Sequence, residues 1–297
     1  MWTVLNQIVS GLILAGPILL ISVSLSTVLA SSRVLNVAVG ASYALIGILA
    51  VRVQAHGGTA AFIAFCLLAP PVLFLVLDLL ILGPQRRNAR EPEMSSFAST
   101  IGVSLILTGF AAMASSSAIL TLPPDFMRID GTWQISGLRI PEDGAVVIAV
   151  AALLSVGFWL LMYRTTAGMQ FRATSADPFL ARATGIRPVR VIRASWVLSG
   201  LLVGVATLLL LIVGRSVSVT SGGDLLLLPF AAVIAGGMGN AVGAALASVV
   251  FGLLEALLTL VTSSGGVQSG IVFGFLFLLL IFRPQGLAVN ARTTRAY

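Results

Sequence analysis

Apolar residues occur along this chain in long uncharged runs, and the polar connections between the runs hold most of the charges. A helix needs about 20 mostly apolar residues to cross a bilayer. The pattern therefore predicts membrane spans over the following ranges: 4–30, 34–51, 59–83, 95–121, 144–163, 191–213 and 267–282, with a longer apolar stretch at 225–262.

The longer stretch is interrupted near its middle by Gly236, Gly237, Gly239 and Asn240. Glycine allows sharp turns and close approach of backbones, so we expect a short helix, a bend and a second helix. In lipid only helices or closed barrels satisfy their backbone hydrogen bonds, and no barrel-like alternation is visible. The sequence predicts an all-α polytopic helix bundle with 8–9 membrane passes, forming a single transmembrane domain over residues 1–297.

Composition excludes several classes of protein. Residues are 58% hydrophobic and 9% charged, with a mean hydropathy of +1.07, whereas soluble domains average about 45–50% apolar and about 25% charged. A soluble enzyme and a disordered chain are therefore excluded. The net charge of +7 comes from arginines in short loops, a pattern typical of membrane topology rather than nucleic-acid binding. Because the first charge is Arg33, we interpret the N-terminal stretch as a membrane helix and not as a cleaved signal.

The arginines predict the orientation of the chain. Thirteen fall on one side of the predicted spans: Arg33, Arg86, Arg87, Arg90, Arg164, Arg172, Arg182, Arg187, Arg190, Arg193, Arg283, Arg292 and Arg295. Four fall on the other side: Arg52, Arg128, Arg139 and Arg215. The positive-inside rule makes the first side cytoplasmic. The N-terminus is then outside and the C-terminus inside, which favours nine passes over eight.

The cytoplasmic loop 164–190 contains the signals of a short helix. Asp177 suits the N-cap, Pro178 the first helical position and Gly185 the left-handed end, while Phe179, Leu180 and Ala183 share one face. A two-turn helix is unstable alone in water, so this one is expected to dock. Its apolar face packs either on its own bundle or on a cytoplasmic partner.

Three segments carry a resemblance to a known family. The loop Gly168 to Arg190, which includes Gly185-Ile186, the segment Phe230 to Glu255 and the motif Phe282 to Leu287 resemble the permease subunits of branched-chain amino acid ABC importers. The resemblance implies a permease subunit of the bacterial inner membrane. It further implies as partners two cytoplasmic ATPase subunits, a second homologous permease subunit, an external substrate-binding protein and membrane lipid, with no nucleic acid. The loop residues that would couple to the ATPases are Asp177, Pro178, Phe179, Leu180, Ala183, Gly185 and Ile186.

The residues that we expect to line the substrate pathway are Asn36, Gly40, Ser42, Tyr43, Gly236, Gly237, Gly239, Asn240 and Glu255. Polar groups in lipid are costly unless they face the bundle or water, and broken helices line cavities in transporters. Several of them have a structural alternative, and Glu255 can be neutral or hydrogen-bonded to a serine or threonine. Asn36 can cap a helix, Tyr43 can pack in the interior or anchor at the lipid interface, and the glycines can serve close packing. Val39 stands where the family has a histidine, so the solute stays open among branched-chain amino acids, other amino acids, urea and short amides.

Chemistry within the chain itself is not expected. There is no Walker-type phosphate loop, no cluster of metal-ligating residues and no paired nucleophile and base, so we expect neither an enzyme nor a cofactor. A stand-alone secondary transporter or channel is the alternative function. It needs buried acids to hold coupling ions, for which Glu255 and Asp78 are the candidates, and Asp78 is also close to the basic loop at Arg86.

Overall fold

The computed structural model describes residues 2–88, 92–115, 119–123, 126, 131–135, 138–262 and 265–282. The helices are α1 (Trp2–Ser32), α2 (Ala38–Leu77), η1 (Asp78–Leu82), α3 (Gly83–Asn88), α4 (Pro92–Ala114), α5 (Glu142–Arg164), α6 (Thr166–Ala176), α7 (Pro178–Ala183), α8 (Pro188–Gly214), α9 (Ser221–Gly236), α10 (Ala241–Leu258) and α11 (Gly265–Phe282). The strands are β1 (Ile119–Thr121), β2 (Thr132–Ile135), β3 (Leu138–Pro141) and β4 (Ser216–Ser218).

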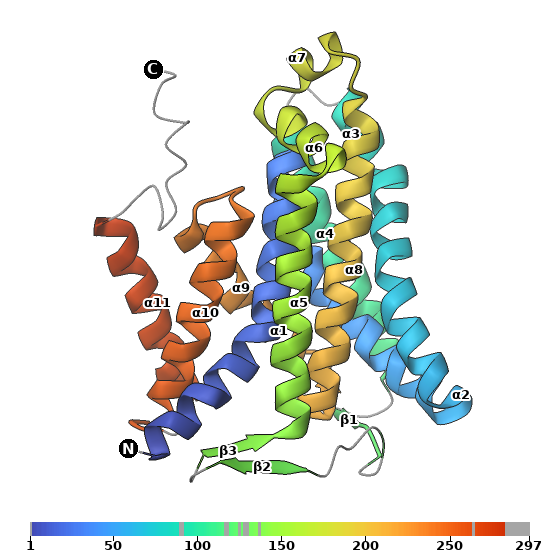
Figure 1. Ribbon diagram of the computed structural model, residues 1–297. Coiled ribbons are helices and arrows are strands. Elements are labelled where there is room, and N and C mark those ends of the chain that lie inside the picture. The colour runs from blue at the N-terminus through green and yellow to red at the C-terminus, as the bar shows by residue number, and fades with distance from the viewer. Residues whose placement is uncertain are drawn as a thin grey trace.

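Within the described ranges, six helices are long and apolar enough to cross a membrane, and α9 is a shorter apolar helix. One of the six, 38–85, is far longer than a single span needs and reverses direction at Gly58, which has φ 70° and ψ −167°. Figure 1 shows its two arms on one side of the bundle. The all-α polytopic prediction is confirmed at this level.

Two predicted boundaries were wrong. The run 95–121 was expected to be one helix, but α4 ends at Ala114 and residues 119–121 form β1, which pairs antiparallel with β4. The run 34–51 was expected to start a helix at its first residue, but α2 begins at Ala38. Hydropathy reports that a segment is apolar and does not report whether its backbone hydrogen bonds are made within a helix or to a neighbouring strand.

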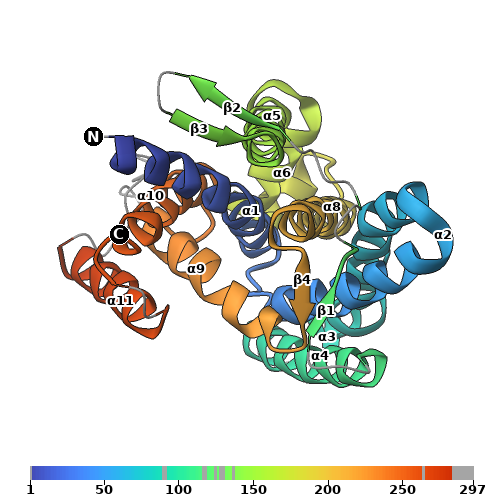
Figure 2. The same cartoon turned by 90° about the horizontal axis from the view of Figure 1, so that it is seen from below.

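Helix α1 lies in the middle of the bundle, between α10 and α8 (Figure 2). It runs antiparallel to α10. A Cβ at Gly252 would lie 2.6 Å from that of Ala15, and Ser248 donates a hydrogen bond to Ser22 at 2.8 Å. On the other side, Ser24 bonds to Ser199 of α8 at 2.6 Å. In lipid there is no hydrophobic driving force between helices. Small residues and buried hydroxyl pairs allow the helices to pack closely instead.

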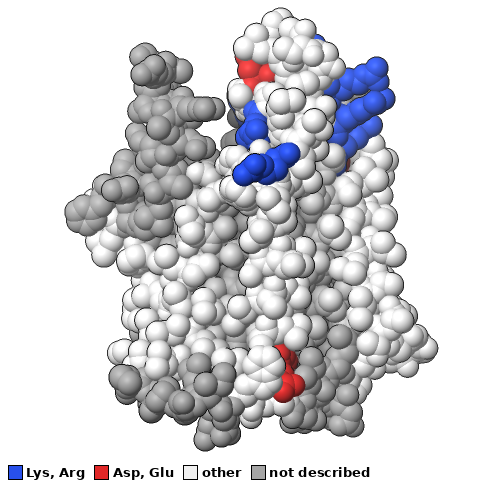
Figure 3. Space-filling view, viewed as in Figure 1, with Lys and Arg blue, Asp and Glu red and all other residues white. Residues whose placement is uncertain are grey.

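The two ends of the bundle differ in structure and charge. Strands β1 to β3 lie at the end where α1 begins, and α6 and α7 lie at the opposite end (Figure 1). Arginine side chains gather at the α6–α8 end, where one acidic patch also shows, and further acidic side chains show at the strand end (Figure 3), where Glu142 and Asp143 form the first turn of α5.

The connection between α1 and α2 runs back into the bundle. The Thr100 hydroxyl donates a hydrogen bond to the carbonyl of Leu35 at 3.1 Å. Thr100 lies well inside α4, which spans Pro92–Ala114. Leu35 therefore lies inside the bundle, three residues before α2 begins. The first arm of α2 then extends to the turn at Gly58. This connection places the start of α2 near the middle of the bundle.

Candidate functional site

The loop between α5 and α8 folds as the sequence predicts. Asp177 accepts hydrogen bonds through Oδ1 from the backbone N–H groups of Phe179 (2.7 Å) and Leu180 (3.1 Å), so it caps α7. Pro178 occupies the first turn of α7, and Gly185 adopts φ +83° after it. The predicted short helix is therefore confirmed as local structure.

The apolar face of α7 is uncovered by the described part of the chain. Phe179 is 77% and Leu180 61% exposed, and Ala183 is exposed beside them. Ala181 is buried and holds the helix to the rest of the loop. These exposures favour a partner, rather than the chain's own bundle, as the surface on which the helix docks. The role of α7 in coupling to an ATPase stays a prediction.

A shallow cavity of about 530 Å³ lies directly after α7. It is lined by Arg182, Gly185, Ile186, Arg187, Pro188, Val189, Arg190 and Arg193. Four guanidinium groups around one cavity make it strongly positive, and a positive cavity attracts acidic side chains. Ile186, one of the predicted coupling residues, lies on its wall.

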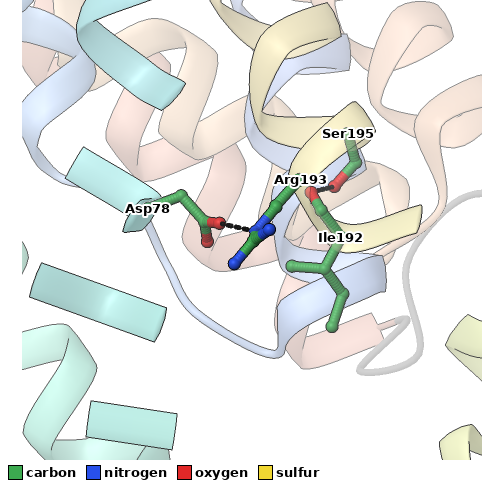
Figure 4. Close-up of polar contacts among 4 residues, drawn as sticks. All are labelled: Asp78, Ile192, Arg193 and Ser195. Atoms are coloured by element: carbon green, nitrogen blue, oxygen red, sulfur yellow. Dashed lines mark hydrogen bonds and ion pairs between the residues drawn. The ribbon is translucent and has the colours of Figure 1, made fainter. Parts of the chain in front are cut away.

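The base of this loop is fixed to the bundle by an ion pair between a buried aspartate and a half-exposed arginine (Figure 4). Asp78 in η1 is 2% exposed, and its Oδ2 lies 3.7 Å from Nε of Arg193 in α8. Two residues further along α8, Ser195 bonds to Ser31 of α1 at 2.6 Å. The first turns of α8 are thus tied to α1 and to η1, which directly follows α2. Arg86, the neighbour predicted for Asp78, has a side chain outside the described ones.

The predicted pathway residues at the start of α2 are buried within the chain. Asn36 is fully buried; its Oδ1 accepts a hydrogen bond from the N–H of Ala38 at 3.2 Å, and its amide nitrogen has no partner in the described structure. Ser42 bonds to the carbonyl of Ala38 at 2.7 Å. Tyr43 packs in an apolar cluster that includes Phe62. Asn36 thus satisfies the first N–H of α2 although Val37 is the N-cap residue, and the roles in transport stay predictions.

Glycine at position 40 permits a close helix crossing. A Cβ there would collide with the carbonyl of Gly222 in α9, and a Cβ at Gly222 would lie 2.8 Å from the carbonyl carbon of Gly40. The start of α9 is therefore fixed against the start of α2.

The predicted bend in the long apolar stretch is present between α9 and α10. Gly237 and Gly239 have φ of 95° and 82°, which L-residues with side chains rarely adopt. Asn240 caps α10 by accepting a hydrogen bond from the N–H of Gly243 at 3.1 Å. A Cβ at Gly236 would collide with backbone atoms of Gly243, so this glycine serves close packing. Whether the bend also lines a pathway is a prediction.

Glu255, predicted as a pathway residue, lies close to the end of its helix. Helix α10 ends at Leu258, so Glu255 lies in its last turn, beside the carbonyl of Ala256 that accepts a 2.6 Å hydrogen bond from Gln7. The side chain is half-buried, and its Oε2 is buried with no hydrogen-bond partner among the described residues. Glu255 is thus near the end of the bundle where α1 begins.

The sequence pattern did not identify one acidic residue, Asp224, as a candidate pathway residue. Asp224 lies in the first turn of α9, immediately after the crossing of Gly222 with Gly40, and its side chain is exposed. The apolar stretch was taken to begin at residue 225, which left this carboxylate just outside the predicted span. A signal was present, because Asp224 is followed by four leucines.

Comparisons with known proteins agree with this architecture. Residues 7–281 match the family described as branched-chain amino acid transport system / permease component. A probable branched-chain amino acid transport permease protein LivH of Methanocaldococcus jannaschii is 30% identical over 290 residues, covering 93% of this chain and 88% of that protein. The permease protein BraD of the high-affinity branched-chain amino acid transport system of Pseudomonas aeruginosa is 27% identical over 95% of each chain.

A further relative has a different solute in its name. The autoinducer 2 import system permease protein LsrD of Yersinia enterocolitica is 26% identical over 192 residues, covering 63% of this chain and 56% of that protein.

Proposed function

Because the chain belongs to the family of branched-chain amino acid transport permease components and is a transmembrane permease subunit of an ABC importer, we propose that it carries branched-chain amino acids or closely related small polar solutes across the inner membrane. Two relatives of nearly full-length coverage have branched-chain amino acid transport in their names. Because the chain is also similar to an autoinducer 2 permease, the proposal includes other small solutes.

We propose nine membrane passes, with the N-terminus outside and the C-terminus in the cytoplasm. The reversal at Gly58 supports counting the two arms of α2 separately, and the bend at 237–239 supports counting α9 and α10 separately. The arginines at the α6–α8 end support a cytoplasmic location for that end (Figure 3). A green fluorescent protein fused after residue 297 should fluoresce, whereas an exported reporter there should be inactive.

The observation that carries the proposed mechanism is the uncovered apolar face of α7. Phe179 and Leu180 are presented at the arginine-rich end, where an ATPase would dock. Closure of two ATPases around ATP would push on α7 and on the first turns of α8. The ion pair of Asp78 with Arg193 would pass this movement to α2. The chain itself would do no covalent chemistry and would need no cofactor.

The pathway itself would lie between this chain and a second, homologous permease subunit, below an external binding protein that delivers the solute. In each proposed complex two permeases would meet two ATPases. Asn36, Gly40, Ser42, Tyr43 and the 236–240 bend stay candidates for positions near this interface. Their burial within the chain supports an indirect role, in which they hold α2 and α9 in place.

Co-purification tests the proposal. Tagged protein extracted from its host in mild detergent should bring with it two ATPases and a second permease. Substituting Phe179→Asp together with Leu180→Asp should remove the ATPases and retain the second permease. Trp133→Asp, at the strand end and 55% exposed, is the matched control and should retain both. Wild-type protein that purifies alone would contradict the proposal.

A further inference from the structure

The side chain of Asp224 faces away from the rest of the chain. It is exposed, as are its neighbour Gly223 and Leu227 one turn later. The opposite face of α9 is buried. There the carbonyl of Pro229 accepts a hydrogen bond from the hydroxyl of Ser22 in α1 at 3.3 Å. The carboxylate makes no ion pair or hydrogen bond with the residues that the structure describes.

Contacts on both sides of α9 place Asp224 near the middle of the membrane. Gly222, two residues earlier, crosses Gly40, the third residue of α2, and α2 starts near the middle of the bundle. On the other side, Pro229 lies beside Ser22, in the second half of the 31-residue helix α1. Along α9, Asp224 lies five residues before Pro229, on the side of the outer end. Asp224 is therefore at about the same depth as the midpoint of α1.

The other described acids do not share this position. Asp78 is buried and paired with Arg193 near the arginine-rich end, and Asp177 caps α7. Glu142 and Asp143 lie at the start of α5, and Glu255 lies in the last turn of α10. Among the acidic side chains that the structure describes, Asp224 alone is both exposed and at mid-depth.

A carboxylate at mid-membrane depth is too costly to face lipid, so Asp224 must face water or protein. The backbone before it is not a spanning helix: β4 pairs with β1, and α9 begins only at Ser221. A helix that begins inside the membrane leaves backbone groups at its start that must be buried in protein or lie in a water-filled cavity, and half-length helices of this kind border the binding sites of transporters.

We propose that Asp224 lines the translocation pathway and binds the ammonium group of the amino acid as it passes the middle of the membrane. This inference rests on the proposed function, because the solute must carry a cationic group. The carboxylate oxygens would accept charge-assisted hydrogen bonds from the ammonium group, which are stronger than neutral ones. Asp224 would thus help to discriminate amino acids from neutral solutes of similar size.

Thiol labelling tests the location without reference to the solute. In full-length complexes that lack the native thiol through Cys66→Ala, Asp224→Cys should react with a water-soluble cationic methanethiosulfonate, because only a hydrated thiol ionises. Leu105→Cys, on a 70% exposed position of α4, is the lipid-facing control and should not react. An Asp224→Cys protein as unreactive as this control would overturn the inference.

Uptake tests the ammonium contact. In proteoliposomes with the ATPases, the second permease and the binding protein, Asp224→Asn should lower leucine uptake by about tenfold or more, and Asp224→Glu should keep part of it. Asp143→Asn, the same change at the outer surface, should transport as wild type does. If Asp224→Asn takes up leucine as fast as the wild-type protein, the ammonium contact is overturned. If wild-type protein imports no amino acid while Asp224→Cys reacts, the proposed solute fails and the ammonium contact with it, but the lining position stands.

Discussion

Gly200 lies where α8 crosses the second arm of α2, and its substitution by alanine gives the clearest test of the packing. A Cβ there would lie 2.7 Å from the carbonyl oxygen of Pro70 and 2.7 Å from Cα of Pro71. Both atoms belong to the backbone, so no side-chain rotation relieves the contact. Ordinary van der Waals contact begins at 3.4 Å, so the two helices must separate by about 0.7 Å, a gap that forfeits a quarter to a half of each contact's attraction.

The expected cost of Gly200→Ala is about 3 kcal/mol, at the upper end of the usual penalty for overpacking. The assay is unfolding of the purified protein in mixed detergent micelles, followed by circular dichroism against the fraction of sodium dodecyl sulfate. Gly102→Ala is the matched control, because a Cβ at that position of α4 has no neighbour within 4 Å. It should leave the midpoint unchanged or raise it slightly. Equal midpoints for the two variants would refute the crossing.

Three further substitutions test other contacts. Arg193→Ala removes the partner of Asp78 and should lower stability by about 1–3 kcal/mol, less than for a fully buried pair because Arg193 is half-exposed; a double-mutant cycle with Asp78→Asn measures the coupling. Arg215→Ala removes a 2.8 Å hydrogen bond to the carbonyl of Phe126, and should make the connection that contains Phe126 more sensitive to protease added to the purified protein. Gly185→Val forces a branched side chain to φ +83°, at about 1–2 kcal/mol, and should weaken stimulation of ATP hydrolysis by loaded binding protein.

The helical spans were predictable because each depends on local composition. Runs of apolar residues predicted the spans, and Gly236, Gly237 and Gly239 predicted the bend. Asp177, Pro178 and Gly185 gave α7, because capping and positive φ are properties of single residues and their nearest neighbours.

Contacts between distant segments were not predictable in the same way. The crossing of Gly40 with Gly222 and the pairing of β1 with β4 join residues far apart in sequence. An apolar run does not show which of its faces meets another helix. For that reason Gly40 was predicted as a pathway residue although its contact is with a backbone, and Asp224 was missed although its exposure at mid-depth is the more unusual feature.

The central claim is that this chain transports only as part of an ATP-driven importer, and uptake by reconstituted proteoliposomes tests it most directly. Leucine uptake should require the ATPases, the second permease, ATP and loaded binding protein together, and should stop when any one is omitted. The contradictory result is leucine uptake by this chain alone, driven by an ion gradient without ATP, which would establish the stand-alone transporter instead.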